Sequence, residues 1–229
     1  MFSNVFLART CREMENPLPR RFAYMALHFS AYTKGLSNFP EKLPEGSMIL
    51  LDDSLEPVDH DPEMVVGQLT ELVGRFSPFA VLLDFQRPVT KELEIMAECI
   101  VKALPCSVGV TESYARNLGC SVFLPPPPAN KALGDYLAQW KKQGVYLEIA
   151  PEGLEFTVTE AGSTKMQIPV VSGLSLTDER LHCHYNVEVL QDRAVFTICR
   201  YKEDLAQLVQ EAEGLGVLGC VGLYTELSK

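Results

Sequence analysis

The chain has 229 residues, of which 47% are hydrophobic and 22% are charged. This composition excludes a disordered chain, and the length allows one domain with a sizeable core. The formal net charge of −10 repels phosphate backbones and anionic lipid surfaces, so we expect neither nucleic acid nor a membrane as a partner. We therefore predict a single domain over residues 1–229 that binds a small molecule or an oligosaccharide in a pocket.

The start of the chain and the cysteines favour a cytoplasmic location. The apolar segment 1–7 is followed closely by Arg9, Arg12 and Glu13, which leaves no signal-peptide core. The seven cysteines are odd in number, scattered, and mostly embedded in apolar runs. They are therefore expected to be buried free thiols in a reducing compartment.

Short apolar runs recur along the chain, and each ends in polar residues, Gly or Pro. They are continuous rather than alternating, which is typical of strands buried on both faces of a parallel sheet. The expected strands are Tyr24–Tyr32, Ser47–Asp53, Phe79–Pro88, Cys106–Ser113, Cys120–Pro128, Val145–Pro151, Ala194–Arg200 and Cys220–Leu227.

Segments with helical apolar spacing separate several of these strands. Asp61 before Pro62 and Thr90 before the next apolar stripe are suitable helix caps. The alternation of strand and helix predicts a (β/α)8 barrel of the TIM type, with an open doubly wound sheet as the alternative. The expected helices are Pro62–Phe76, Thr90–Leu104, Ala129–Lys142 and Lys202–Leu215.

Two segments depart from this alternation. Residues 33–46 hold two prolines and no helical face, so we expect an irregular loop in place of a helix. Residues 154–193 alternate between apolar and polar side chains and contain turn residues at 161–163 and 191–192, which predicts an antiparallel β-hairpin insertion. Such an insertion either forms a wall of a binding cleft or is a surface decoration.

In barrels of this type, functional side chains lie at the carboxyl ends of the strands. Acids, aromatic rings and an arginine gather there, a combination that suits a hydroxyl-rich ligand such as a sugar. An acid just after a strand also often caps a helix or pairs with a cation. The candidate catalytic residues are Asp84, Glu112 and Glu148, and the candidate substrate-binding residues are Tyr32, Asp53, Gln86, Arg87, Tyr201, Tyr224 and Glu226.

The stretch FAVLLDFQRP, residues Phe79–Pro88, resembles the signature strand of the chitinase-like glycoside hydrolases of family eighteen. That signature reads roughly DxxDxDWEYP, with alternate acids pointing into the barrel. Aligning the two terminal prolines places Asp84 on the aspartate beside the catalytic acid, Gln86 on the catalytic glutamate, and Leu82 on another aspartate. In the family this strand is the fourth of the barrel. It is the third of the strands given above, so the match requires one more strand near residues 4–7.

The resemblance implies a glycoside hydrolase whose glutamate protonates the glycosidic oxygen, while the acetamido group of the substrate, oriented by the neighbouring aspartate, is the nucleophile. A glutamine at position 86 cannot act as that general acid. Glu112 and Glu148, on later strands, are the natural replacements. Asp84 stands out on its own, because burying a charge inside the run Val81–Phe85 is costly without a partner.

Three functions stay open. The first is a glycoside hydrolase with Asp84 and Glu112 as catalytic carboxylates and Glu148 as the substitute. The second is a non-catalytic barrel that binds a glycan or another polyol, which Gln86 favours. The third is an enzyme acting on another small metabolite, because this fold hosts many chemistries.

Motifs for cofactors are not found in the sequence. It contains no GxxxxGK[ST] or GxSxG pattern and no CxxC pair. Its GxGxxG match, residues 214–219, precedes a predicted strand instead of following one, and most simply ends a helix. We therefore expect no cofactor and no metal. His182 and His184 alternate along a predicted strand, and two such residues are more often ordinary strand histidines than metal ligands.

Overall fold

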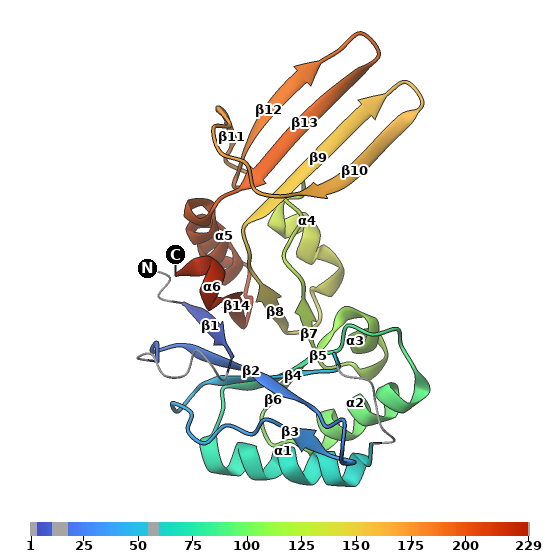
Figure 1. Ribbon diagram of the computed structural model, residues 1–229, viewed down its shortest axis with the longest axis vertical. Helices are drawn as coiled ribbons and strands as arrows, with labels where there is room; N and C mark the ends of the chain where they lie inside the picture. Colours follow the sequence, from blue (N-terminus) through green and yellow to red (C-terminus); the bar gives the residue numbers. More distant parts are fainter. Residues whose placement is uncertain (1–3, 11–17, 55–59, 229) are drawn as a thin grey trace.

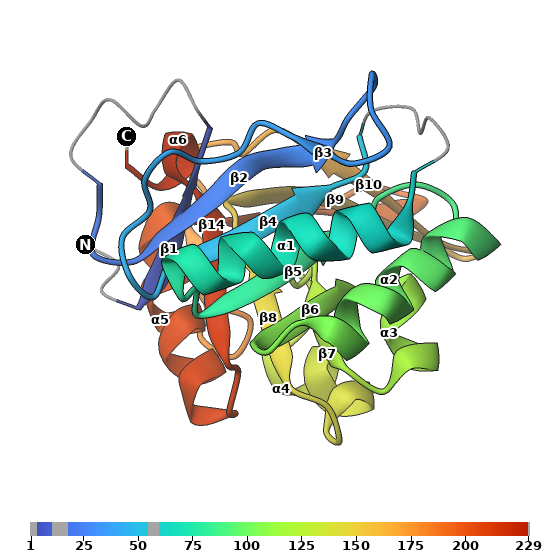
Figure 2. The ribbon, with the colours of Figure 1, turned by 90° about the horizontal axis from the view of Figure 1, so that it is seen from below.

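The computed structural model describes residues 4–10, 18–54 and 60–228. Eight parallel strands close into a barrel, because the first strand pairs with both the second and the last (Figure 1, Figure 2). The predicted TIM-type barrel is therefore confirmed, and the open-sheet alternative is wrong. The barrel strands are β1 (Val5–Arg9), β2 (Phe22–Phe29), β4 (Met48–Asp52), β5 (Ala80–Asp84), β6 (Ser107–Thr111), β7 (Ser121–Leu124), β8 (Val145–Glu148) and β14 (Gly219–Leu223).

Helices cover the outside of the barrel. Asp61 caps the first helix by accepting the N–H of Glu63 at 3.0 Å, and Thr90 caps the second by accepting the N–H of Leu93 at 3.3 Å. The helix over residues 112–118 was not predicted. The helices are α1 (Pro62–Phe76), α2 (Lys91–Ala103), α3 (Glu112–Leu118), α4 (Leu133–Leu137) followed by the 3-10 turn η2 (Ala138–Trp140), α5 (Lys202–Gly214) and α6 (Tyr224–Leu227).

The identity of two barrel strands differs from the prediction. Val5–Arg9 forms β1, which the sequence reading left out, whereas Ala194–Arg200 belongs to a separate sheet. The error at residues 194–200 arose because the run AVFTICR is apolar enough to resemble a buried parallel strand. With β1 counted, β5 is the fourth barrel strand, which is the place of the signature strand in the family that it resembles.

The barrel interior is filled by alternate side chains of its strands. Phe6, Met48, Leu82 and Tyr146 form one inner cluster, while the intervening side chains pack outward against the helices. Gly109 makes room for two of these side chains, because a Cβ there would lie 2.7 Å from the ring of Tyr146 and 2.9 Å from Leu82. The core therefore fills the barrel beneath the strand ends, so a ligand has access only at those ends.

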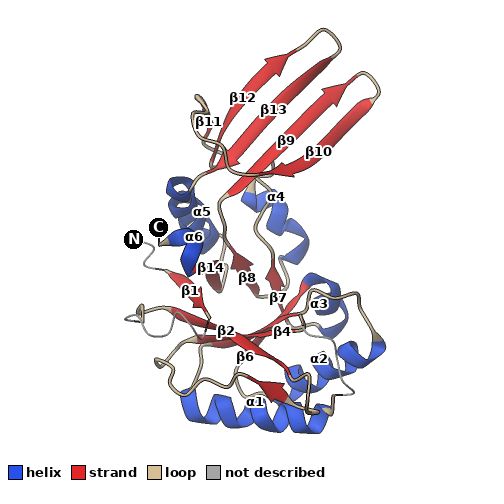
Figure 3. Ribbon diagram, in the orientation of Figure 1, coloured by secondary structure: helices blue, strands red, loops and turns tan. Residues whose placement is uncertain are grey.

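The predicted antiparallel insertion is confirmed, although it is a five-stranded sheet rather than one hairpin (Figure 3). It lies between β8 and α5 and projects away from the barrel. A short strand, β3 (Leu36–Ser37), also pairs antiparallel with β2 inside the predicted irregular loop. The sheet consists of β9 (Glu152–Thr159), β10 (Gly162–Ile168), β11 (Leu176–Asp178), β12 (Cys183–Val189) and β13 (Arg193–Arg200).

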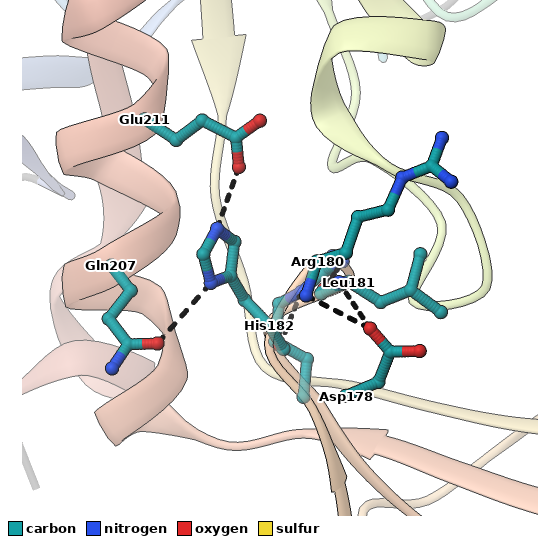
Figure 4. A network of polar contacts seen from close by, with 7 residues as sticks. Asp178, Arg180, Leu181, His182, Gln207 and Glu211 are labelled. Carbon is teal, nitrogen blue, oxygen red and sulfur yellow. Dashed lines mark hydrogen bonds and ion pairs between the residues drawn. The ribbon is translucent and has the colours of Figure 1, made fainter.

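The junction between this sheet and the barrel is built around Arg200, which is 1% exposed. Its guanidinium donates hydrogen bonds to the carbonyls of Leu181, at 2.9 Å, and His182, at 3.3 Å, and to that of Pro127 in the segment after β7. The imidazole of His182 in turn points toward α5, where it meets Glu211 at 2.7 Å (Figure 4). One buried cation therefore connects the sheet, the barrel loop and, through His182, a barrel helix.

The cysteines in the described part of the chain form no disulfide bond with one another. The six cysteines found there are free thiols, and three of them, Cys183, Cys199 and Cys220, are buried. Burial raises the pKa of Cys183 to about 11 and that of Cys220 to about 12.

Of the helices described, none is long and apolar enough to cross a membrane.

Candidate functional site

A pocket of about 530 Å³ opens at the mouth of the barrel, the end where its strands have their carboxyl termini. It brings together five of the predicted site residues, from the ends of three barrel strands, β5, β6 and β8. Parallel strands place their carboxyl ends at one edge, which explains how residues far apart in sequence meet here. These residues are Asp84, Gln86, Arg87, Glu112 and Glu148.

Asp84 ends β5 on the inner face of the barrel, in line with Ala80 and Leu82 of the inner cluster. Gln86 lies on the same side, and its amide donates a hydrogen bond to a carboxylate oxygen of Asp84. Burial raises the pKa of Asp84, the hydrogen bond from Gln86 lowers it, and the nearby carboxylates Asp52 and Asp53 raise it again. The expected orientation of Asp84 and Gln86 is thus found, whereas their roles stay predictions.

Glu148 ends β8 on the inner face above Tyr146. Burial raises its pKa from 4.5 to about 7, with further increases from the negative charges of Asp84 and Glu226. Both influences disfavour the ionised form, so a large share of this side chain carries a proton at neutral pH. A carboxylic acid that is protonated near pH 7 is well suited to proton donation.

Glu112 has a different environment, at the first position of α3. One of its oxygens forms an ion pair with Arg116, one helical turn later, at 2.7 Å, and its side chain is 38% exposed. An ion pair with a guanidinium requires the carboxylate form. The two candidate acids thus differ in their surroundings, because Glu112 is paired with a guanidinium whereas Glu148 lies near other carboxylates, and their catalytic roles stay predictions.

Asp53, predicted to bind substrate, is 2% exposed and holds the loop after β5. One of its oxygens accepts the N–H of Gln86 at 2.8 Å, and the other accepts the N–H of Arg87 at 3.2 Å. Its neighbour Asp52 accepts the N–H and the hydroxyl of Ser54, at 2.9 and 2.6 Å. Asp53 thus fixes the backbone that carries two pocket residues and is itself turned away from the pocket.

The other predicted binding residues are not among those that line the pocket. Tyr32 is 96% exposed in the loop after β2. Tyr201 follows β13 rather than a barrel strand, and its hydroxyl donates to the carbonyl of Val171 at 2.9 Å. Tyr224 and Glu226 belong to the short helix α6, which corrects the strand predicted over residues 220–227. Glu226 acts on the site through its charge, and Arg9 lies 3.6 Å above the Tyr224 ring.

Arg116 and Phe123 line the pocket but were missed by the sequence analysis. Arg116 was overlooked because α3 was not predicted, although its spacing of four residues from Glu112 is a signal for a helical ion pair. Phe123 occupies an inward position of β7 that nothing in the sequence distinguishes from its neighbours.

The part of the chain covered by the structure contains no group of three or more His, Cys, Asp or Glu side chains placed to hold a metal ion. His182 and His184 instead contact two carboxylates of α5, Glu211 at 2.7 Å and Asp204 at 3.2 Å.

The fold and the pocket together define a TIM barrel whose mouth is lined by carboxylates.

No protein-family model and no curated protein matches the sequence, but solved structures match the fold. A family 18 chitinase mutant from Cycas revoluta, in complex with (GlcNAc)4, has a TM-score of 0.54 at 11% identity, covering 96% of this chain and 94% of that one. A chitinase-like agglutinin from Robinia pseudoacacia gives 0.54 at 10% identity, covering 94% and 93%. The spore cortex-lytic enzyme SleL from Bacillus cereus gives 0.50 at 8% identity, covering 96% and 70%. The fold is thus that of the family 18 chitinase barrels.

Proposed function

We propose that this chain is a glycoside-hydrolase-like barrel that binds an oligosaccharide at its mouth and uses Glu148 as its general acid. The observation that carries the proposal is the half-buried position of Glu148 among other acids, in the same pocket as Asp84, with a pKa of about 7. The chitinase from Cycas revoluta, whose barrel this fold resembles, holds (GlcNAc)4, which supports a carbohydrate as the ligand class.

In this proposal Glu148 donates its proton to the glycosidic oxygen as the bond to the anomeric carbon breaks. The carboxylate of Asp84, held by the amide of Gln86, faces the positive charge that develops on that carbon. Water then adds to the carbon and returns a proton to the ionised Glu148, which restores the starting state. The ion pair of Glu112 with Arg116 shapes the wall of the pocket.

The test is hydrolysis of aryl glycosides and chitin oligosaccharides by wild type, Glu148→Gln and Glu112→Gln. We expect Glu148→Gln to lower turnover by about 10²- to 10⁴-fold, the usual contribution of a general acid. Glu112→Gln is the matched control, because it makes the same chemical change on the pocket wall. Loss of turnover in Glu112→Gln with retention in Glu148→Gln would overturn the assignment of the acid.

The proposal also predicts the pH dependence of turnover. Because Glu148 must be protonated to donate, and its pKa is about 7, the rate is expected to fall as pH rises through about 7, approaching tenfold per unit above it. A rate that stays constant from pH 6 to pH 9 would exclude Glu148 as the acid.

The second candidate is a lectin-like barrel that binds an oligosaccharide without cleaving it. It is favoured by Gln86, which the resemblance aligns with a catalytic glutamate, and by the fold likeness to an agglutinin. In that case wild type binds sugar in calorimetry and shows no turnover, and Gln86→Glu gains activity. Turnover by wild type that Gln86→Glu leaves unchanged would exclude this candidate, and absence of both binding and turnover would overturn both.

A further inference from the structure

Charge is unevenly distributed within the mouth pocket. Asp84 and Glu148 lie on its inner floor, and the charged groups that shift their pKa are other carboxylates. Arg87 and Arg116 line the same pocket. A guanidinium close to a buried carboxylate favours its ionised form and lowers its pKa. Neither arginine is among the groups that shift the pKa values of Asp84 and Glu148.

The backbone of Arg87 is hydrogen-bonded, whereas its guanidinium has no hydrogen-bond or ion-pair partner among the described residues. Its N–H is held by Asp53 at 3.2 Å, which fixes the position of the residue at the pocket. Among the described residues, no carboxylate or other group pairs with its guanidinium.

The guanidinium of Arg116 uses part of its hydrogen-bonding capacity within the protein. One terminal nitrogen binds Glu112 at 2.7 Å, and the centre of its guanidinium lies 5.5 Å from the Trp140 ring. A guanidinium has five N–H donors in a planar fork, so most of those of Arg116 stay available. Its own charge is balanced by Glu112, which leaves Arg87 as the unbalanced cation of this pocket wall.

We propose that the ligand of this pocket is an acidic oligosaccharide, whose sugar carries a carboxylate that binds Arg87. This inference rests on the proposed carbohydrate function and adds the substrate class. A guanidinium recognises a carboxylate through two parallel charge-assisted hydrogen bonds, whereas neutral sugar hydroxyls need no such cation. One unbalanced positive charge matches one carboxylate, and a doubly charged phosphate would add repulsion from Asp84 on the floor.

The carboxylate can belong to either of two sugar types. It is attached to C6 in a uronic acid and to an ether side chain in an N-acetylmuramic acid. Three disaccharides distinguish these sources: two linked N-acetylglucosamines as the neutral probe, N-acetylglucosaminyl-N-acetylmuramic acid, and an N-acetylglucosamine linked to glucuronic acid. We expect at least one acidic disaccharide to bind about ten- to a hundredfold more tightly than the neutral one, as a charge-assisted contact provides.

The decisive measurement is isothermal titration calorimetry with wild type and Arg87→Gln. The variant is expected to bind the acidic disaccharide no more tightly than the neutral one. Arg193→Gln is the matched control, because it removes the same charge from an exposed site on β13. Thermal unfolding checks that Arg87→Gln is folded, which is expected since its guanidinium makes no hydrogen bond, ion pair or ring contact with the described residues.

Three outcomes would overturn this inference. If the neutral disaccharide binds wild type as tightly as both acidic ones, the pocket does not select a carboxylate, and the proposed carbohydrate function stands. If Arg87→Gln and Arg193→Gln weaken acidic binding equally, the effect is one of net charge. If no disaccharide or longer oligosaccharide binds wild type, both the inference and the proposed function fail.

Discussion

Two ionisable side chains, the buried Arg200 at the junction and the half-buried Glu148 at the mouth, have opposite electrostatic surroundings. Arg200 donates to three backbone carbonyls from two segments. Glu148 is surrounded by apolar groups and by two further acids, and these raise its pKa to about 7. A buried guanidinium that donates from all three of its nitrogens stabilises a junction, whereas a carboxyl group held among like charges is poised to change its protonation state.

The largest stability effect is expected at the junction. Arg200→Met keeps much of the side-chain length but leaves three carbonyls without their donor, so we expect a loss of about 2 to 5 kcal/mol in the free energy of unfolding. Chemical denaturation measures it. Arg193→Met, an exposed position on the same strand, is the control and is expected to change stability by less than about 0.5 kcal/mol. Equal effects of the two variants would show that the network contributes nothing specific.

At the mouth of the barrel, by contrast, a substitution is expected to increase stability at high pH. The pKa of Glu148 is raised from 4.5 to about 7 in the folded state, so the folded protein holds a proton that the unfolded chain releases between these values. Stability from this group is therefore lost as pH rises from about 4.5 to 7. Glu148→Gln removes the effect. The free energy of unfolding of the variant minus that of wild type should therefore be about 1 to 3 kcal/mol larger at pH 8 than at pH 4. A difference between the two proteins that does not vary with pH would contradict a raised pKa.

A smaller effect is expected at the edge of the junction. His182 meets Glu211 at 2.7 Å and Gln207 at 3.3 Å, so its replacement by Ala should cost about 1 kcal/mol. Glu213→Gln, on the exposed side of α5, is a control that should change stability little. If urea denaturation finds no loss for His182→Ala, the sheet is held on the barrel by Arg200 and apolar packing without this contact.

The barrel was largely predictable from the sequence. The inserted sheet was predictable as an antiparallel insertion, but its five strands were not. Continuous apolar runs and helix caps at Asp61 and Thr90 identified seven of the eight barrel strands and the first two helices with bounds close to those observed. The strand over residues 5–9 is no shorter than other strands that were identified, and it was missed because its apolar run was considered as a possible signal peptide. Residues 194–200 were misassigned because a half-buried antiparallel strand can carry as many apolar residues as a parallel one.

The site was predictable only as a set of strand ends. That rule selected Asp84, Gln86, Arg87, Glu112 and Glu148, which the structure brings into one pocket. It could not tell which of the acids is buried among other acids and which is paired, because these properties depend on distances across the barrel. The assignment of Glu148 over Glu112 therefore needed the fold.

The proposed carbohydrate site is the mouth of the barrel and not the inserted sheet. Amide chemical-shift mapping by NMR, during titration with a chitin oligosaccharide or an acidic disaccharide, distinguishes the two regions. We expect shifts at residues 84–87, 111–116 and 148, with a Kd that the same titration provides. Shifts confined to residues 152–200, or the absence of any shift with every oligosaccharide, would contradict this placement of the site.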